Sequence, residues 1–298
     1  MTGHAIAYRS QEALAAKPLE TVVIFADIDG TFLVPPHAQR SSGADGILAS
    51  ERIAVVLCSS MTRAELEIVQ QDLGIRQPFI CESGAAILIP DGYFPFEVAR
   101  DRHLAGYDVI TFGRPYTHVV GVLHRVAARL NTPIVGFSDQ SVEQVARESG
   151  LSLSWARLAK LREYDEPFRL LDPTRESHDR LWRALRSAGL ACTARGFRDH
   201  VGAPVNKGHS VAVLTALYRR AFGRVVTAGV GTAPHSATLL HRVHAPFVIG
   251  SPAGSSPWSL PEVPRIAGTS DETSWIDTMV EVANRARTQR QRQAWMAQ

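Results

Sequence analysis

The chain has 298 residues, of which 45% are apolar and 20% are charged. This balance suits one compact unit or two unequal domains with a sizeable core, and it excludes a disordered or fibrous chain. The formal net charge is +3, and its basic side is carried almost wholly by arginine, because lysine occurs only at Lys17, Lys160 and Lys207. From a charge this small we expect no nucleic-acid partner.

No early segment has the length of a membrane span or the pattern of a signal. The longest early apolar run, residues 22–26, has five residues, against the roughly 20 that a bilayer helix needs. Residues 1–18 carry charges throughout and lack an apolar centre, so they do not resemble a secretory signal. The cysteines Cys58, Cys81 and Cys192 are too scattered for a disulfide framework. We expect a cytoplasmic protein without a membrane partner.

In chain order, short β-branched runs alternate with stretches of helical spacing. The predicted elements are strands at 21–31 and 52–60, a helix at 62–74, a strand with a hairpin at 78–90, a helix at 206–223, and strands at 224–231 and 245–250. Strands that alternate with helices in this way predict an α/β fold, a doubly wound parallel sheet covered on both faces.

The intervening stretch contains too much predicted structure for a loop. Its strand-like pieces are residues 108–112, 133–137, 168–172 and 191–195, and its helical pieces are 117–130, 141–149 and 177–190. This composition predicts an inserted α/β domain. The predicted organisation is a core at 18–90 and 199–285, an insert at 91–198, and a basic C-terminal tail at 286–298.

Two acids, Asp27 and Asp29, directly follow the first apolar run. In an extended chain their side chains lie on one face, and Gly30 permits a sharp exit that exposes them. At the carboxyl end of a buried strand, one carboxylate can attack an electrophile while the other handles the proton of the leaving group. Calcium loops and ordinary turns share this pattern, but the apolar run before it favours the catalytic interpretation.

Ser59 and Lys207 have the chemistry of phosphate ligands. Ser59 follows a strand and precedes a helix, so its hydroxyl and the first free amides of that helix suit a phosphate. Lys207 begins another helix and carries the charge to neutralise an anionic intermediate. Either residue alone is explained equally well by a helix cap or a solvated first turn. Together with the acid pair, in this order, they indicate phosphate transfer.

With the segments around them, these residues give the chain a resemblance to the haloacid dehalogenase superfamily and, within it, to the mannosyl-3-phosphoglycerate phosphatase family. The likeness covers nearly the whole chain and is carried by FADIDGTFL, VVLCSSMTRAE, PFICESGAAILIP, GYF, VGFSDQSVEQVARESGL, LAKLREYDEPF and NKGHSVAVL. REYDEPF and GFSD are the most specific because they lie in the insert. The resemblance implies a haloacid dehalogenase-like core and an α/β cap domain that closes over a phosphorylated sugar.

The resemblance also implies roles for single residues. Asp27 is the implied nucleophile and Asp29 the implied general acid/base. The implied phosphate ligands are Ser59 and Lys207, and the other candidates for phosphate or substrate binding beside them are Gly30, Thr31, Ser60 and His235. Arg162 and Asp139 are candidates for substrate contacts from the cap, and salt bridges within the cap explain either residue at least as well. The implied substrate is a phosphorylated sugar or related anionic carbohydrate, and the implied cofactor is Mg²⁺ with Asp27 among its ligands. The sequence leaves open whether the chain forms a homodimer.

The fourth motif of the family departs from its pattern here. The family has Gly-Asp-Ser-x-Asn-Asp after a strand, and its acids help to hold magnesium. In this chain Thr232 and Ser236 stand at the acidic positions, His235 stands at the asparagine, and no Asp or Glu occurs from residue 200 to residue 261. A hard dication prefers oxygen ligands, carboxylates above all. The sequence therefore predicts a metal dependence that is weakened or lost, and a site without any metal stays open.

Three functions remain open at this point. The first is a sugar-phosphate phosphatase with a weakened or rearranged metal site. The second is a non-phosphatase enzyme that uses the acid pair for metal-independent acid/base or glycosyl chemistry on a sugar or nucleotide. The third is a catalytically inactive ligand-binding module, which the acid pair argues against because buried carboxylates without a task are costly.

Overall fold

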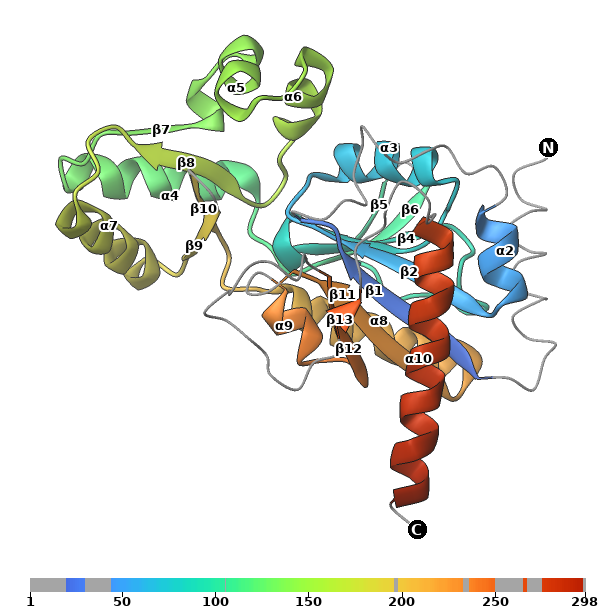
Figure 1. The fold of residues 1–298 in the computed structure, drawn as a ribbon. Coiled ribbons are helices and arrows are strands. Elements are labelled where there is room, and N and C mark those ends of the chain that lie inside the picture. The colour runs from blue at the N-terminus through green and yellow to red at the C-terminus, as the bar shows by residue number, and fades with distance from the viewer. Residues whose placement is uncertain are drawn as a thin grey trace.

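The computed structural model describes residues 20–29, 44–104, 106–195, 198–232, 236–249, 265–266 and 275–296. They form a larger α/β core and a smaller α/β cap beside it (Figure 1). Among the described helices, none combines the length and the apolar character needed to cross a membrane.

The core contains a nine-stranded sheet within the described residues, in the order β13-β12-β11-β1-β2-β3-β4-β6-β5. The strands from β13 to β3 pair in parallel, and β4, β6 and β5 extend the sheet in antiparallel fashion. The bounds are β1 (Thr21–Asp27), β2 (Ile53–Cys58), β3 (Phe79–Cys81), β4 (Ala86–Pro90), β5 (Arg102–Leu104), β6 (Tyr107–Thr111), β11 (Val225–Gly231), β12 (Ala245–Ile249) and β13 (Arg265–Ile266).

Helices cover both faces of this sheet, as the doubly wound pattern predicts. Successive residues of β1 point to opposite faces: Val22 and Ile24 pack with α2, α3 and α10, whereas Val23 and Phe25 pack with α8 and α9. All seven residues of β1 are buried, as expected of a central parallel strand. The bounds are α2 (Ala44–Ser50), α3 (Arg63–Leu73), α8 (Lys207–Phe222), α9 (Ala237–Leu240) and α10 (Trp275–Met296).

The cap has its own antiparallel sheet, in the order β7-β8-β10-β9. Helices α4 and α7 pack on one side of it through Val119, Leu123, Leu181 and Leu185. The bounds are α4 (Tyr116–Arg129), β7 (Ile134–Gly136), α5 (Val142–Ser149), α6 (Leu153–Ala159), β8 (Glu166–Leu170), α7 (Arg175–Ser187), β9 (Ala191–Arg195) and β10 (Arg198–Gly202).

The sheets divide the chain differently from the predicted boundaries 91 and 198. Strands β5 and β6 precede the cap and join the core sheet, because β6 pairs antiparallel with β4 along its whole length. At the other boundary β10 belongs to the cap, where it pairs with β8 and β9. Residue 286, predicted to begin a tail, lies inside the continuous helix α10.

The strand order brings the predicted chemistry to one edge. β1 lies between β2, which precedes helix α3, and β11, which precedes α9, so the direction of chain progression reverses at β1. Ligands in open α/β sheets bind at the carboxyl ends of strands at such a reversal. Asp27 ends β1 in register with Cys58 of β2, and Gly231 ends β11.

Candidate active site

The two acids that follow β1 share one ammonium group. Lys207 Nζ lies 2.6 Å from Asp27 Oδ1 and 2.7 Å from Asp29 Oδ2. Asp27 is fully buried, and the Lys207 side chain is 3% exposed. The Asp29 backbone N–H donates to Asp27 Oδ1 at 3.1 Å. Asp27 Oδ2 is therefore the carboxylate oxygen left without a hydrogen-bond partner among the described residues.

The donors expected for a phosphate are bound to the Asp29 carboxylate. Ser59 Oγ donates to Asp29 Oδ1 at 2.5 Å, and the backbone N–H of Ser60 lies 3.0 Å from both Asp29 oxygens. Lys207 Nζ provides the third donor. A carboxylate and a phosphate make the same kind of charge-assisted hydrogen bond. The Asp29 carboxylate thus lies where these donors would bind a phosphate.

Local structure aims Lys207 at the acids. Asn206 is the N-cap of α8, and its side chain accepts the N–H of His209 at 3.1 Å, so the asparagine has a capping role. The helix start packs directly on Gly84, where a Cβ atom would come within 2.5 Å of the Asn206 carbonyl and 2.7 Å of the Lys207 nitrogen. Because only glycine leaves this space, Gly84 sets the position of the lysine.

On the other side of Asp27, hydroxyl groups stand where the family has acids. Thr232 Oγ1 donates to the backbone oxygen of Asp29 at 3.3 Å, and Ser236 is fully buried. A Cβ on Gly231 would come within 2.1 Å of Ser236 Oγ and 3.0 Å of Asp27 Cβ, so Ser236 and Asp27 pack against the same glycine. Ser236 Oγ has no hydrogen-bond partner among the described residues.

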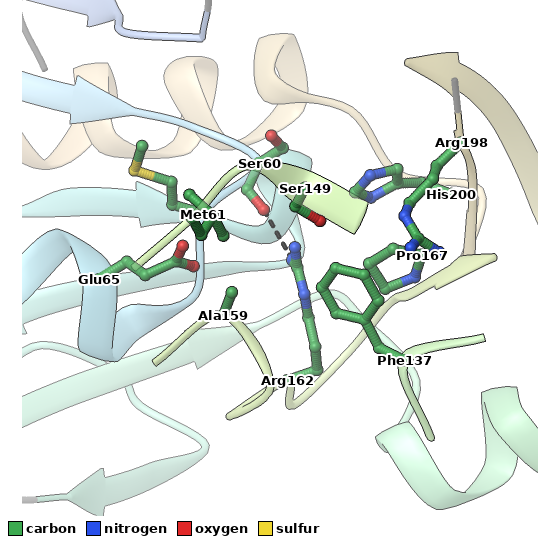
Figure 2. A pocket seen from close by; sticks show the side chains of 11 residues that line it. Ser60, Met61, Glu65, Phe137, Ser149, Ala159, Arg162, Pro167, Arg198 and His200 are labelled. Atoms are coloured by element: carbon green, nitrogen blue, oxygen red, sulfur yellow. Dashed lines mark hydrogen bonds between the residues drawn. The ribbon is translucent and has the colours of Figure 1, made fainter. Parts of the chain in front are cut away.

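A cavity of about 220 Å³ adjoins this site between the core and the cap (Figure 2). Arg162 enters it from the cap, and its Nη1 donates to the backbone oxygen of Ser60 at 2.7 Å. The lining residues are Ser60, Met61, Glu65, Phe137, Ser149, Leu151, Ala159, Arg162, Pro167, Arg198 and His200. Arg162 is ion-paired with Asp165 and Arg198 with Glu148. Two guanidinium groups and one histidine against one glutamate in the lining still suit an anionic ligand.

Two groups beside the site have shifted pKa values. Burial, and after it the Asp27 carboxylate, raises the pKa of the Cys58 thiol well above its usual value, so this neighbour of Asp27 stays neutral. Burial alone would lower the pKa of Arg162, but Asp165 and Glu82 outweigh it and raise that pKa. Arg162 is therefore a fixed positive charge at the wall of the cavity.

Comparison with known proteins gives this geometry a family. A glucosyl-3-phosphoglycerate/mannosyl-3-phosphoglycerate phosphatase from Methanococcoides burtonii is 36% identical over 236 residues, covering 78% of this chain and 86% of the relative. A protein of the same name from Persephonella marina is 32% identical, covering 76% of this chain and 84% of the relative. The chain belongs to this phosphatase family. No family model matches it.

Solved structures agree on the fold. A haloacid dehalogenase-like hydrolase from Bacteroides thetaiotaomicron aligns with a TM-score of 0.59 at 11% identity, covering 88% of this chain and 100% of that chain. A phosphatase of the haloalkanoate dehalogenase superfamily from the same organism aligns with a TM-score of 0.57 at 13% identity, over 91% and 95% of the two chains. The predicted α/β fold, a haloacid dehalogenase-like core with a cap, is confirmed. Membership of the phosphatase family makes the chain a phosphatase-like hydrolase.

The structure brings together most of the residues implied for this phosphatase site. Asp27, Asp29, Ser59, Ser60 and Lys207 are in mutual contact, and Arg162 reaches them through Ser60. The predicted residues Gly30, Thr31 and His235 lie outside the described residues.

Asp139 has a structural role in the cap. Its Oδ2 accepts the backbone N–H of Gly136 at 2.8 Å, and Oδ1 lies 3.3 Å from His124. The carboxylate thus closes the short helix η2 (Phe137–Asp139), and it is not among the residues that line the cavity. The predicted substrate contact through Asp139 finds no support in this geometry.

The residues present do not fit a resident magnesium ion. Phosphatases of this superfamily generally use Mg²⁺. In this chain Asp27 is the carboxylate on the metal side, Lys207 already neutralises it, and Thr232 and Ser236 offer neutral hydroxyls. Mg²⁺ sites rely on carboxylates and phosphates for charge. The carboxylate supply falls short of that requirement.

Sequence reasoning missed two residues that shape the site. Glu82 binds the cap segment before β8, and His200 lines the cavity with its Nδ1 3.0 Å from Asp165 Oδ2. The signal for Glu82 was a charged residue directly after the apolar run of β3, at the same carboxyl edge as Asp27. No local pattern singled out His200, because its contact depends on pairing within the cap sheet.

Proposed function

We propose that this chain hydrolyses the phosphomonoester of a glycosyl-3-phosphoglycerate, the substrate class for which its relatives are named. The observation that carries the proposal is the pair of buried Asp27 and partly buried Asp29 on the ammonium of Lys207, with the Ser59 hydroxyl and the Ser60 amide bound to the same Asp29 carboxylate. A nucleophile, a proton carrier and three phosphate donors thus meet at the carboxyl edge of the sheet.

In the first step the phosphate of the substrate takes over the donors now bound to Asp29, namely Ser59 Oγ, the Ser60 N–H and Lys207 Nζ. The Asp27 Oδ2 electron pair, which has no hydrogen-bond partner among the described residues, attacks phosphorus. Asp29, displaced from these donors by the phosphate, takes up a proton from water. The bond from phosphorus to the ester oxygen breaks, and Asp29 gives this proton to that oxygen. The products of this step are an aspartyl phosphate and the free glycosyl-glycerate.

In the second step Asp29, now ionised, takes a proton from water as the water oxygen attacks the aspartyl phosphate. The bond between Asp27 and phosphorus breaks, inorganic phosphate leaves, Asp29 returns its proton to water, and both acids return to their starting states. Lys207 stays within reach of both carboxylates, so one ammonium group balances charge throughout.

The cavity beside Ser60 suits the leaving group. A glycosyl-glycerate has a carboxylate and several hydroxyl groups, and the cavity has positive charge from Arg162 and Arg198 together with polar donors. Because Arg162 also binds the Ser60 carbonyl, an anion bound by this arginine lies next to the phosphate loop.

We further propose that turnover needs less magnesium than the superfamily generally does, or none. At an effective dielectric of 20, two unit charges about 4 Å apart repel by roughly 4 kcal/mol, so an approaching phosphate needs a counter-charge. Lys207 and the neutral donors of Ser59 and Ser60 supply part of it. The cost of lacking a metal is therefore a slower reaction at an otherwise complete site.

The test measures phosphate release from glucosyl- and mannosyl-3-phosphoglycerate by the wild type and by Asp27→Asn. Losing the nucleophile is expected to reduce kcat at least about a thousandfold. Asp45→Asn is a matched control, since Asp45 accepts hydrogen bonds from residues 76 and 77, remote from the acid pair. EDTA is expected to leave the wild-type rate within about threefold. No release from either substrate by the wild type overturns the proposal.

A second candidate is metal-independent glycosyl or acid/base chemistry, which the hydroxyls at Thr232 and Ser236 favour. Product analysis separates the two functions. Inorganic phosphate with an intact glycoside supports phosphatase chemistry, and a free sugar with phosphoglycerate supports glycosyl transfer to water. Both reactions require the acid pair, so the two functions are distinguished by which bond of the substrate breaks.

A further inference from the structure

The turn η1 (Glu82–Gly84) between β3 and β4 has an unusual backbone. Its φ angles are +42° at Glu82, +63° at Ser83 and +102° at Gly84. Non-glycine residues rarely adopt this left-handed region, and a run of them persists only where the surroundings fix it. We therefore expect the contacts of this turn to hold its backbone in this conformation.

Within the core, the turn touches both halves of the phosphate site. The Ser83 N–H donates to the Ser59 carbonyl at 2.9 Å, and the Glu82 N–H donates to the Met61 carbonyl at 2.9 Å. Gly84 packs on the start of the Lys207 helix, and its carbonyl accepts the Ser210 hydroxyl at 2.7 Å. One short turn thus positions the serine loop and the lysine together.

The Glu82 carboxylate points from this turn to the cap. It accepts three successive backbone N–H groups, those of Glu163 at 2.9 Å, Tyr164 at 2.8 Å and Asp165 at 2.9 Å. Glu82 is 1% exposed. Successive amides that converge on one carboxylate form a charge-assisted site of high directionality. We name residues 162–165, which contain these amides, the docking loop.

The docking loop carries part of the cavity wall. Arg162 donates to Asp165 Oδ1 at 2.8 Å as well as to the Ser60 carbonyl, and His200 Nδ1 lies 3.0 Å from Asp165 Oδ2. Tyr164 belongs to the buried hydrophobic cluster of the core. The position of this loop on the core therefore decides where Arg162 and His200 stand relative to the phosphate site.

We propose that Glu82 is a positioning residue that docks residues 162–165 onto the core and so holds the cationic wall of the cavity against the Asp27 site. It touches neither phosphate nor leaving group. Its effect reaches the reaction through Arg162 and Ser60. The kinetic part of this inference rests on the proposed function, whereas the docking itself does not.

The charges around Glu82 agree with a tightly held contact. Asp165 and Arg162 of the docking loop face it, the Glu163 and Tyr164 amides approach it, and Glu65 of α3 lies near Arg162. Burial, and then Asp165, raises the pKa of Glu82 to about 8, and Arg162 with the amides opposes this rise. Any change in this carboxyl group alters several buried partners at once.

The test compares Glu82→Gln with Glu166→Gln in the full-length chain. Glu166 is a matched control because it is fully buried and accepts hydrogen bonds from Tyr116 and Ser138, all within the cap. Glu82→Gln puts an amide NH₂ opposite at least one backbone donor. Amide hydrogen exchange over residues 162–165 is expected to accelerate about tenfold or more in this variant and to change less than about twofold in the control.

Kinetics provide the second readout. With a glycosyl-3-phosphoglycerate, Glu82→Gln is expected to lower kcat/KM about tenfold or more, chiefly through KM, whereas para-nitrophenyl phosphate, which has no glycoside to bind, loses less than about threefold. Glu82→Asp is expected to recover part of the loss. Unchanged exchange over residues 162–165 in Glu82→Gln overturns the proposal even if the chain is an active phosphatase. An inactive wild type overturns the proposed function while the exchange result still decides the docking.

Discussion

The Asp29 carboxylate binds the donors that are expected to bind phosphate, so removing it should change the affinity for phosphate. In Asp29→Ala the Ser59 hydroxyl, the Ser60 amide and Lys207 lose their carboxylate partner. Inorganic phosphate is then expected to bind at least about tenfold more tightly, because it no longer displaces a like charge. Turnover is expected to fall at least about a hundredfold without the proton carrier.

Titration calorimetry with inorganic phosphate measures the binding change. Asp29→Asn is the control, since its amide oxygen keeps an acceptor in place while the negative charge is removed. It is expected to fall between the wild type and the alanine variant. Weaker phosphate binding in Asp29→Ala would show that Asp29 does not compete with the anion.

Thr232 allows a direct test of the missing metal ligands. Thr232→Asp adds a carboxylate beside the Asp29 backbone oxygen, two residues from Asp27. A second carboxylate supplies the charge that a hard dication needs, so Mg²⁺ is expected to bind at least about tenfold more tightly and turnover to become sensitive to EDTA. The comparison is with Thr232→Asn, which matches the shape without the charge. Equal Mg²⁺ affinity in both variants contradicts the prediction.

Among the secondary-structure elements, the close contact between η1 and α8 depends on Gly84. In Gly84→Ala the new Cβ meets backbone atoms of Asn206 at 2.5 Å, and φ is +102°. Backbone cannot yield as a flexible side chain does, so α8 and its lysine must shift. The free energy of unfolding is expected to fall by about 2–4 kcal/mol, and turnover is expected to fall with it.

The matched control for this variant is Gly92→Ala. Gly92 also has a positive φ, +68°, but nothing lies within 4 Å of its added Cβ. This substitution is expected to cost about 1 kcal/mol, from backbone strain alone. Urea unfolding of the two variants separates strain from steric contact, and equal losses would mean that the approach of α8 to Gly84 is not tight.

The elements that could be predicted are those fixed by local pattern. β2 is a uniformly apolar run, β1 has an apolar run from Val22 to Ala26 between Thr21 and Asp27, and both strands are wholly buried. Helix α3 begins after Thr62, which makes a capping box with Glu65, and ends at Gly74 in the left-handed conformation. These signals depend on residues a few positions apart, so they can be recognised in the sequence alone.

The features that escaped prediction depend on pairing across the chain. The sequence assigns the strand at 108–112 to the insert, whereas antiparallel pairing with β4 places β6 in the core sheet, and no local pattern shows that pairing. The acid pair, Ser59 and Lys207 were found because the carboxyl ends of parallel strands meet at one edge. The contact between Asp29 and Ser59 joins residues 30 positions apart, and the contacts of Glu82 with residues 163–165 join residues 81 or more positions apart. Contacts over such separations depend on the whole fold.

In the molecule as a whole, hydrogen bonds and ion pairs attach the cap to the core, beside the packing of Tyr164 in the core cluster. Glu163 binds Arg63 and Arg102 of the core, and Thr62 Oγ1 donates to the Leu158 carbonyl at 3.0 Å. The chain enters the cap at Gly113, where a Cβ would come within 2.7 Å of Tyr164. An interface of this kind is sensitive to the protonation of its buried groups.

The stability of this interface is therefore expected to depend on pH through Glu82. Burial and Asp165 raise the pKa of Glu82 from 4.5 to about 8. Burial also acts to raise the pKa of Asp165, but Arg162 and His200 outweigh it and lower that pKa to about 2, so Asp165 stays ionised. A glutamate with a raised pKa contributes stability that is fully present below 4.5 and is lost as the pH rises through about 8.

Urea unfolding of the wild type and of Glu82→Gln across this pH range measures the effect, because glutamine does not titrate and all other groups cancel in the difference. The wild-type free energy of unfolding is expected to fall relative to that of the variant as the pH rises from 4.5 towards about 8, and the difference is expected to stay level above that. Hydrogen exchange over residues 162–165 is expected to follow the same curve, since these amides bind the titrating carboxyl group. A difference that is constant with pH would mean that Glu82 is ionised throughout, held so by its three amide donors.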